Sequence, residues 1–261
     1  MASITSESEI VRRGFSIWPN EFSTDAYRLM LREPIFIIGS YAVSIMITAI
    51  GTAGGLFIVS MTGYALQRRD FRMRNFIALF IYFTTLFNAR MLPFYLLIVN
   101  FLKLKDSYLA VILPLMVSPW LIILMRNYMK SIPYSITESA KIDGLGDLRI
   151  FLKLILPLAK PGLATVGLFL ALGYWNEWYM SILFLSRNVE HRPLPLYLYN
   201  LINLGEEITK VAAQANIPVR ELPSESLKMA TAVVTILPVI FFYPYAQRYF
   251  IRGITIGAVK G

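Results

Sequence analysis

The chain contains no cysteine and only one histidine, His191, among its 261 residues. Without cysteine there is no disulfide framework, no thiolate nucleophile and no cysteine metal site. One histidine argues against a histidine metal cluster or a Ser-His-Asp triad, and we expect His191 to be a solvated loop residue. Charge is also scarce, at 16% of residues against about 25% in soluble domains. These absences exclude an ordinary cytoplasmic enzyme, a disordered protein and a disulfide-stapled secreted domain.

Hydrophobic residues make up 56% of the chain, and they gather into long blocks. A helix needs roughly 20 mostly apolar residues to cross the bilayer core. Five segments meet this requirement: Ile35–Leu66, Phe76–Phe101, Tyr108–Met125, Leu154–Trp178 and Met229–Ile251. The first is rich in small residues, which favour close helix approach, and several contain proline, which bends helices. The sequence therefore predicts an all-α, polytopic membrane helix bundle.

The net charge of +9 could point to nucleic acid, but the mean hydropathy of +0.57 favours basic loops that set membrane topology. Lysine and arginine concentrate in the loops Gln67–Asn75 and Arg126–Lys153. We therefore expect these loops to face the cytoplasm. An amino-terminal arm (1–34) and a long loop (about 179–228) then lie outside, and no nucleic acid is expected as a partner.

The second basic loop has the features of a short helix. Ser131 and Pro133 are typical of a helix start, and Gly144 is a natural left-handed stop. About three turns are predicted from Pro133 to Asp143, with Asp147 as the cap of the next helix. Such a helix is suited to docking into a partner protein. Resting on lipid headgroups is an equal alternative on these grounds.

A longer motif runs through this loop: Glu138-Ser139-Ala140-Lys141-Ile142-Asp143-Gly144, nine residues, then Leu154-Ile155-Leu156-Pro157. It resembles the EAA loop of binding-protein-dependent ABC importer permeases, which reads Glu-Ala-Ala, three residues, Gly, nine residues, Ile-x-Leu-Pro. The chain departs from it at Ser139 and Leu154, both mildly. Residues Gly173–Trp178 and the ending Tyr249–Gly261 resemble the carbohydrate branch, the maltose-type second permeases, and within it the complex-oligosaccharide subgroup.

This resemblance covers nearly the whole chain and implies the type I ABC importer transmembrane domain in the bacterial cytoplasmic (inner) membrane. Family members have six spans, so the first would be missing here through a shortened start, which explains the polar arm 1–34. A true five-span protein is the alternative. The permease domain would cover 35–251, with a coupling helix at about 131–147 and a cytoplasmic tail at 252–261.

The resemblance also implies how the loop works. In the family this helix lies in a groove of the ATPase subunit, Glu138 meets a basic residue there, and Gly144 makes a bend. The expected coupling residues are Glu138, Ser139, Ala140, Asp143, Gly144, Leu156 and Pro157. The sequence has no Gly-x4-Gly-Lys-Ser/Thr phosphate loop. The chain is thus predicted not to be an enzyme and to hold no cofactor or metal, with ATP and Mg bound by a separate ATPase.

The implied partners are a homologous second permease, an ABC ATPase dimer, an extracytoplasmic solute-binding protein, an oligosaccharide substrate and membrane lipid. A sugar path should mix aromatic rings with amides and charges. The candidates are Asn88, Arg90, Tyr174, Asn176, Glu177 and Trp178. An interfacial aromatic belt is the alternative for the rings around position 175.

Arg90 falls in the middle of the second predicted span, where an unpaired arginine costs roughly 3 kcal/mol. We therefore expect it to face a wet cavity or to pair with an acid, and a cation in the path would suit an acidic oligosaccharide. The other functions considered are an ABC permease for a non-sugar solute, an ion-coupled secondary transporter and an intramembrane enzyme. For a secondary transporter the chain lacks paired charges at mid-membrane, and for an intramembrane enzyme it lacks paired carboxylates within a span.

Overall fold

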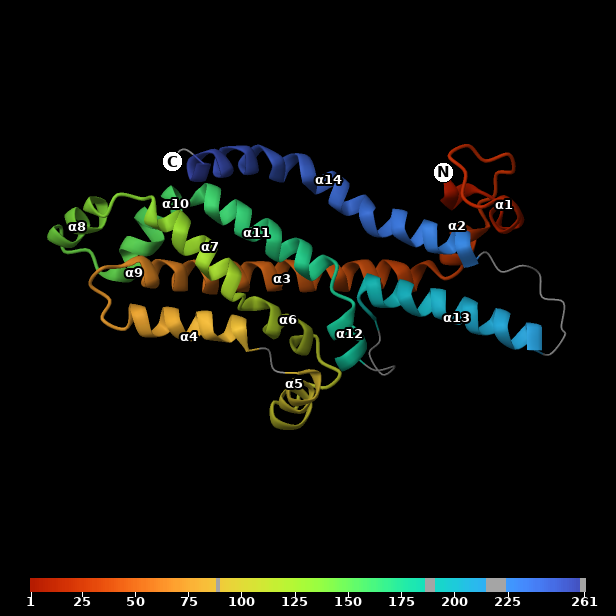
Figure 1. Ribbon diagram of the computed structural model, residues 1–261, viewed down its shortest axis with the longest axis horizontal. Helices are drawn as coiled ribbons and strands as arrows, with labels where there is room; N and C mark the ends of the chain where they lie inside the picture. The colour runs from red at the N-terminus through yellow and green to blue at the C-terminus, as the bar shows by residue number, and fades with distance from the viewer. Residues whose placement is uncertain (88–89, 186–190, 215–223, 259–261) are drawn as a thin grey trace. The chain divides into compact units, whose positions relative to one another are not determined.

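A computed structural model describes residues 1–87, 90–185, 191–214 and 224–258, and these are helical almost throughout (Figure 1). Within the described residues, β pairing is limited to an isolated bridge between Thr5 and Phe22. The chain divides into two units. The first unit comprises Met1–Ile45, Glu177–Ile182 and Arg187–Phe242, and the second comprises Met46–Asn176, Leu183–Ser186 and Tyr243–Gly261. The all-α fold predicted from the sequence is confirmed.

The first unit contains the amino-terminal arm. Its elements are η1 (Ala2–Ile4), α1 (Glu7–Arg13), α2 (Asp25–Met30), the start of α3 (Pro34–Gln67), most of α12 (Tyr179–Phe184), α13 (Leu194–Gln214) and the first part of α14 (Ser224–Ala258). The Glu7 carboxylate accepts hydrogen bonds from the backbone N–H groups of Glu225 (2.9 Å) and Ser226 (3.0 Å). Because these N–H groups open α14, Glu7 caps that helix and ties the arm to it.

A second carboxylate organises the arm itself. Glu9 accepts hydrogen bonds from the backbone N–H groups of Asn20 (3.0 Å) and Glu21 (2.8 Å). These bonds favour the charged form and lower the pKa of Glu9. The arm, which the sequence presented as a polar tail, is therefore a folded segment.

Polar groups of α3 bond to other helices of the first unit. The Tyr41 hydroxyl donates to the Val234 carbonyl at 2.7 Å, and Ser44 Oγ accepts from the backbone N–H of Leu194 at 2.7 Å. His191 packs on the same helix, since a Cβ added at Gly39 would lie 2.6 Å from its Nδ1. The expectation of a solvated His191 is wrong, because the missing side chain of Gly39 leaves space that the imidazole occupies.

The second unit contains the remaining helices. They are α4 (Arg74–Leu86), α5 (Met91–Leu96), η2 (Leu97–Phe101), α6 (Leu109–Met116), α7 (Pro119–Lys130), α8 (Ser135–Ile142), α9 (Asp147–Ile150), η3 (Phe151–Ile155), α10 (Leu156–Leu158) and α11 (Lys160–Trp175). Helix α11 packs on α6 and α7, and α4 packs on α7.

Two straight helical segments of the described chain are long and apolar enough to cross a membrane, α3 and Ser224–Phe241 of α14. Three bent helix pairs pass the same test, which gives up to five spans. This number agrees with the sequence prediction. Helix α14 begins earlier than the predicted Met229, and it continues to Ala258 through most of the segment predicted as a tail.

The bends fall near prolines and change the predicted boundaries. Helices α6 and α7 meet at 45°, where Ser118 Oγ accepts from the N–H of Leu121 and Pro119 opens α7. Residues Asp147–Leu158 are turned by 85° from α11. The fourth predicted span is therefore a bent pair rather than one continuous helix, and Pro157 and Pro161 flank the break between α10 and α11.

Glycines let the second half of α3 approach its neighbours. A Cβ at Gly63 would lie 3.0 Å from the backbone nitrogen of Arg126 in α7. At Gly51 it would lie 2.3 Å from Cζ of Tyr174, which is in α11. The close helix approach that the sequence predicted from these small residues is confirmed, while many of the larger side chains of α3 stay exposed.

Candidate functional site

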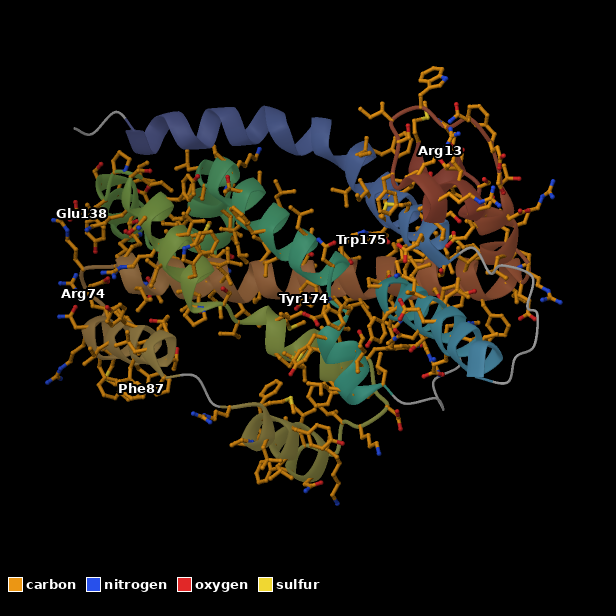
Figure 2. All side chains as sticks on the ribbon, turned by 45° about the vertical axis from the view of Figure 1, so that its right-hand side comes forward. Arg13, Arg74, Phe87, Glu138, Tyr174 and Trp175 are labelled. Atoms are coloured by element: carbon orange, nitrogen blue, oxygen red, sulfur yellow. The ribbon has the colours of Figure 1, made fainter. Side chains whose placement is uncertain are left out.

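The short helix of the second basic loop is α8, which spans Ser135–Ile142. It lies at the end of the second unit where α3 ends and α4 begins, and Figure 2 shows Glu138 and Arg74 at this end. The helix begins later than predicted and has about two turns rather than three. Ser131 does not cap it, because its hydroxyl donates to the Tyr128 carbonyl (2.7 Å) at the end of α7.

The end of α8 is as predicted. Gly144 has a φ of +77°, its N–H donates to the Lys141 carbonyl, and the Leu145 N–H donates to the Ala140 carbonyl, both at 3.0 Å. This pair of bonds is the Schellman motif, which requires a left-handed residue at the Gly144 position. Gly144 therefore sets the direction in which the chain leaves the helix.

The two sides of α8 differ in exposure. Thr137 and Ala140 are buried, whereas Glu138, Ser139 and Asp143 are exposed. Ile142 leaves 86% of its surface exposed. An isolated apolar side chain on a surface is unremarkable, but here it lies on a helix face that also presents a carboxylate.

The other two expected coupling residues belong to α10, directly before the 85° turn into α11. Leu156 is half-buried and Pro157 is exposed. The second unit thus holds all seven expected coupling residues, with five at α8 and its end and two at the bend. Their coupling role stays a prediction.

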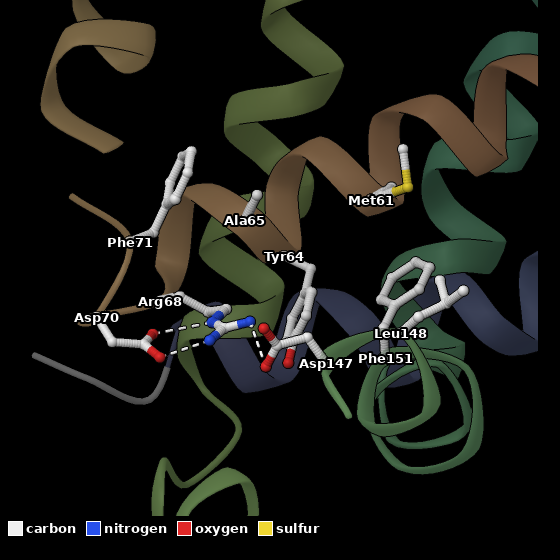
Figure 3. Close-up of a pocket in the computed structure, with 9 residues that line it drawn as sticks. All are labelled: Met61, Tyr64, Ala65, Arg68, Asp70, Phe71, Asp147, Leu148 and Phe151. Carbon is white, nitrogen blue, oxygen red and sulfur yellow. Dashed lines mark hydrogen bonds and ion pairs between the residues drawn. The ribbon is translucent and has the colours of Figure 1, made fainter. Parts of the chain in front are cut away.

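Four charged side chains join α8 and α9 to the end of α3, and Figure 3 shows three of them, Arg68, Asp70 and Asp147. The Arg68 guanidinium donates to Asp70 (Nε to Oδ1, 2.9 Å) and forms an ion pair with Asp147 at 2.7 Å. Lys141 Nζ donates to Asp70 Oδ2. Asp147 opens α9 but makes no side-chain cap bond. The prediction that Asp147 is a cap is therefore wrong, because its carboxylate pairs with Arg68 instead.

These contacts shift the titration of the loop charges. Donation from Arg68 and then from Lys141 holds the pKa of Asp70 below its usual value. The bond to Asp70 raises the pKa of Lys141. Both shifts favour the charged forms, so the charges persist at neutral and mildly acidic pH.

A cavity of about 460 Å³ lies beside these charges. Its remaining walls are Met61, Tyr64, Ala65, Phe71, Leu148 and Phe151 (Figure 3). Tyr64 stacks on Phe151 at a centroid distance of 5.3 Å, and Arg68 lies 5.8 Å from the Tyr64 ring centre. The cavity thus separates parts of α3 from α9 and η3, while the charges and the contacts of Phe151 with Tyr64 and Phe57 connect them.

Sequence reasoning did not find this charged group. It treated the arginines of 67–75 only as a topology signal. Asp70 is the one acidic residue in that loop, and a single acid among arginines was the available signal. Its partner Lys141 is 71 residues away, which no local pattern connects.

Tyr174, a substrate-path candidate, lies inside the second unit (Figure 2). Its hydroxyl donates to the Ile112 carbonyl at 2.7 Å, and its ring covers Gly51. The amide of Asn176 donates to the Leu172 carbonyl at 2.9 Å, which ties it to the last turn of α11. Tyr174 is therefore a buried packing residue, whereas Asn176 is exposed.

Glu177 and Trp178 belong to the first unit. The Glu177 carboxylate accepts from the N–H of Met180 at 2.7 Å, in the first turn of α12. Trp178 stacks on Tyr199 of α13 with ring centroids 5.6 Å apart, and the two residues remain 46% and 42% exposed. Trp178 and Tyr199 therefore form an accessible aromatic surface, and the sequence pattern had not indicated Tyr199.

The remaining candidates lie near the break between α4 and α5. Asn88 is outside the described residues. Arg90 is exposed and directly precedes α5. Arg90 lies at a break in the second predicted span, which the sequence also shows as interrupted there, because α4 ends at Leu86 and α5 is bent from it by 118°. Whether any of these residues contacts a substrate stays a prediction.

A helical bundle with bent spans and a short helix exposed at one end is the architecture of a transport permease. Residues 60–256 match the family described as "Binding-protein-dependent transport system inner membrane component". The chain belongs to this family.

Its relatives include named sugar transport permeases. The polygalacturonan/rhamnogalacturonan transport system permease protein YtcP of Bacillus subtilis is 38% identical over all of this chain and 90% of its own length. Protein LplC of the same organism is 36% identical over 99% of this chain and 86% of its own. A solved bacterial ABC transporter involved in import of the acidic polysaccharide alginate matches with a TM-score of 0.81. The two sequences are 34% identical, and the match covers 95% of this chain and 87% of the transporter chain.

Proposed function

We propose that this chain is a transmembrane permease subunit of an ATP-driven, binding-protein-dependent oligosaccharide importer in the bacterial cytoplasmic membrane. It assembles with a homologous permease, an ATPase dimer that binds ATP and Mg, and an extracytoplasmic binding protein. The basic loops, α8 included, face the cytoplasm and the arm faces outward. The exposed face of α8 carries this proposal, since it offers Glu138 and Ile142 on a helix that leaves them uncovered.

Helix-in-groove docking explains this exposure. An amphipathic helix seats its apolar side chain in a groove while its charged residue selects the partner. Ile142 is then the apolar anchor in the ATPase, and Glu138 pairs with a basic group there. Closure of the ATPase dimer moves α8, and the bundle alternates between outward and inward access.

The docking proposal is tested with two variants, Glu138→Ala and Ile142→Asp, in the complex reconstituted in proteoliposomes. Loss of an anchor of about 2 kcal/mol weakens docking roughly 30-fold. We expect the ATPase to co-purify poorly and ATP-dependent uptake to fall in parallel. Asp25→Ala, an exposed carboxylate of the arm, is the matched control and should behave like the parent protein.

Normal ATPase co-purification and uptake in both variants would contradict docking through α8. Uptake by the parent protein that continues after ATP or Mg is removed would instead indicate a gradient-driven carrier.

We further propose that the substrate is an acidic oligosaccharide. Relatives named for polygalacturonan and alginate transport support this substrate class, because both polymers carry carboxylates. The exposed guanidinium of Arg90 offers a charge for such a carboxylate, and the rings of Trp178 and Tyr199 offer faces for sugar stacking.

The substrate proposal is tested by comparing uptake of oligogalacturonate and neutral arabinooligosaccharide. Arg90→Gln should lower uptake of the acidic sugar alone, whereas the control Lys105→Gln should lower neither. Equal uptake of both sugars by the parent protein and by Arg90→Gln would refute the acidic preference.

A further inference from the structure

The charges at the end of α3 form an unbroken series of alternating sign, Lys141, Asp70, Arg68 and Asp147. Each neighbouring pair is in contact, and Lys141 also approaches Asp147 at 3.9 Å. The first and last members flank the left-handed turn at Gly144, and the middle two directly follow α3. The series therefore joins the second basic loop to the first at two points.

Arg68 is the member that makes this connection strong. Its side chain is only 12% exposed, and both of its partners are carboxylates. Exposed ion pairs contribute little because water screens them, but a shielded guanidinium with paired hydrogen bonds is held in one geometry. Asp70 and Lys141 are 36% and 37% exposed and Asp147 is 58% exposed, so Arg68 is the shielded member of the series.

Apolar packing is incomplete beside this connection. The cavity of about 460 Å³ lies between the end of α3 and the segment containing Leu148 and Phe151 (Figure 3). Phe151 contacts the rings of Tyr64 and Phe57 on α3, whereas Asp147 reaches α3 through its ion pair with Arg68. The charges therefore add a connection between α3 and the start of α9 on the side where the cavity leaves a gap.

We propose that Arg68, Asp70, Lys141 and Asp147 form a charged clamp that makes α8 and α3 move as one body. The clamp residues are positioning residues, since they act through α8 and need not touch the ATPase or the sugar. The exposed face of α8 receives the movement, and the clamp passes it to α3. This inference rests on the proposed coupling role of α8 for its consequence, though not for the existence of the clamp.

The clamp itself is tested by a distance measurement that needs no transport. Because the chain has no cysteine, spin labels can be placed at Met73→Cys and Ser135→Cys alone. The parent complex should give one narrow distance distribution. Asp70→Asn and Arg68→Gln should broaden it at least twofold, and the control Arg72→Gln, which removes an exposed charge from the same loop, should not. Unchanged distributions in both clamp variants would overturn the proposal.

The consequence is tested by the number of sugars imported per ATP hydrolysed. Clamp variants should lower this ratio at least fivefold while the ATPase still co-purifies. Arg68→Lys keeps a positive charge between Asp70 and Asp147, so it should retain a clearly larger share of the ratio than Arg68→Gln, which a merely structural role does not predict. Equal losses in Arg68→Lys and Arg68→Gln overturn the clamp. Failure of the parent protein to couple ATP to uptake refutes the proposed function instead, while the distance measurement still decides the clamp.

Discussion

The contact between Gly51 and Tyr174 yields a quantitative prediction about the bundle. A methyl group at Gly51 would lie 2.3 to 2.6 Å from three ring atoms of Tyr174. The ring is 4% exposed and its hydroxyl is bound to Ile112, so it has little room to move. Overpacking of this kind costs about 1–3 kcal/mol. Alanine recovers roughly 0.5–1 kcal/mol as a better helix former.

We therefore expect Gly51→Ala to lower the free energy of unfolding by roughly 1–2 kcal/mol. The measurement is unfolding by SDS in mixed micelles, followed by circular dichroism. Gly173→Ala is the matched control, because nothing lies within 4 Å of an added Cβ there, and it should be neutral or stabilising. It also measures the helix-former term directly in the same unit.

Substitutions of Tyr174 test whether its ring causes the cost of Gly51→Ala. In a Tyr174→Leu background the ring is absent, so the additional cost of Gly51→Ala should disappear. In a Tyr174→Phe background the ring remains, so the cost should persist, and the lost hydroxyl alone should cost about 0.6 kcal/mol. A Gly51→Ala cost equal to that of Gly173→Ala, or one that survives Tyr174→Leu, would refute the reasoning.

Two further predictions concern the backbone turn and the arm. Gly144→Ala should lower the free energy of unfolding by about 1–2 kcal/mol, because alanine is strained at the left-handed φ of this residue, and amide exchange at the end of α8 should become faster. Gly146 is equally open but has a φ of −71°, so Gly146→Ala should be tolerated. Equal amide exchange in the two variants would contradict this reasoning. Because backbone donors lower the pKa of Glu9 below its ordinary 4.5, its stabilisation of the arm is complete above that pH and is lost as pH falls through the lowered value. Exchange protection at Asn20 and Glu21 should therefore be equal at pH 7 and 5, and protection lost already at pH 5 would contradict the assignment.

The spans were predictable because a bilayer imposes a length and an apolar composition on every crossing helix. The bends of these spans were less predictable. Proline at position 119 or 157 marks a place where a helix loses a bond, but the resulting 45° and 85° angles depend on what packs on either side. The sequence indicated an interruption around Arg90 within the apolar block 76–101, but it did not indicate the 118° bend found there.

Local chemistry also determined the end of α8, since Gly144 is the residue that best tolerates a left-handed φ. It did not determine the start of α8, because the Ser131 hydroxyl donates to the Tyr128 carbonyl of α7 instead of capping α8. The folded arm was likewise not predictable, since Glu7 and Glu9 bind backbone groups 11 or more residues away.

Hydropathy, proline and glycine act locally, so the sequence by itself determined a membrane helix bundle with a short helix in its second basic loop. The permease class came from the resemblance of the motif around that helix. Only the tertiary structure decided which charges meet. The sequence does not say which acids pair with Arg68, and the fold brings it to Asp70 and Asp147. Tyr174, an apparent ligand residue in the sequence, became a buried contact of Gly51. Ion pairs and close packing depend on distances between remote segments, which the order of residues does not state.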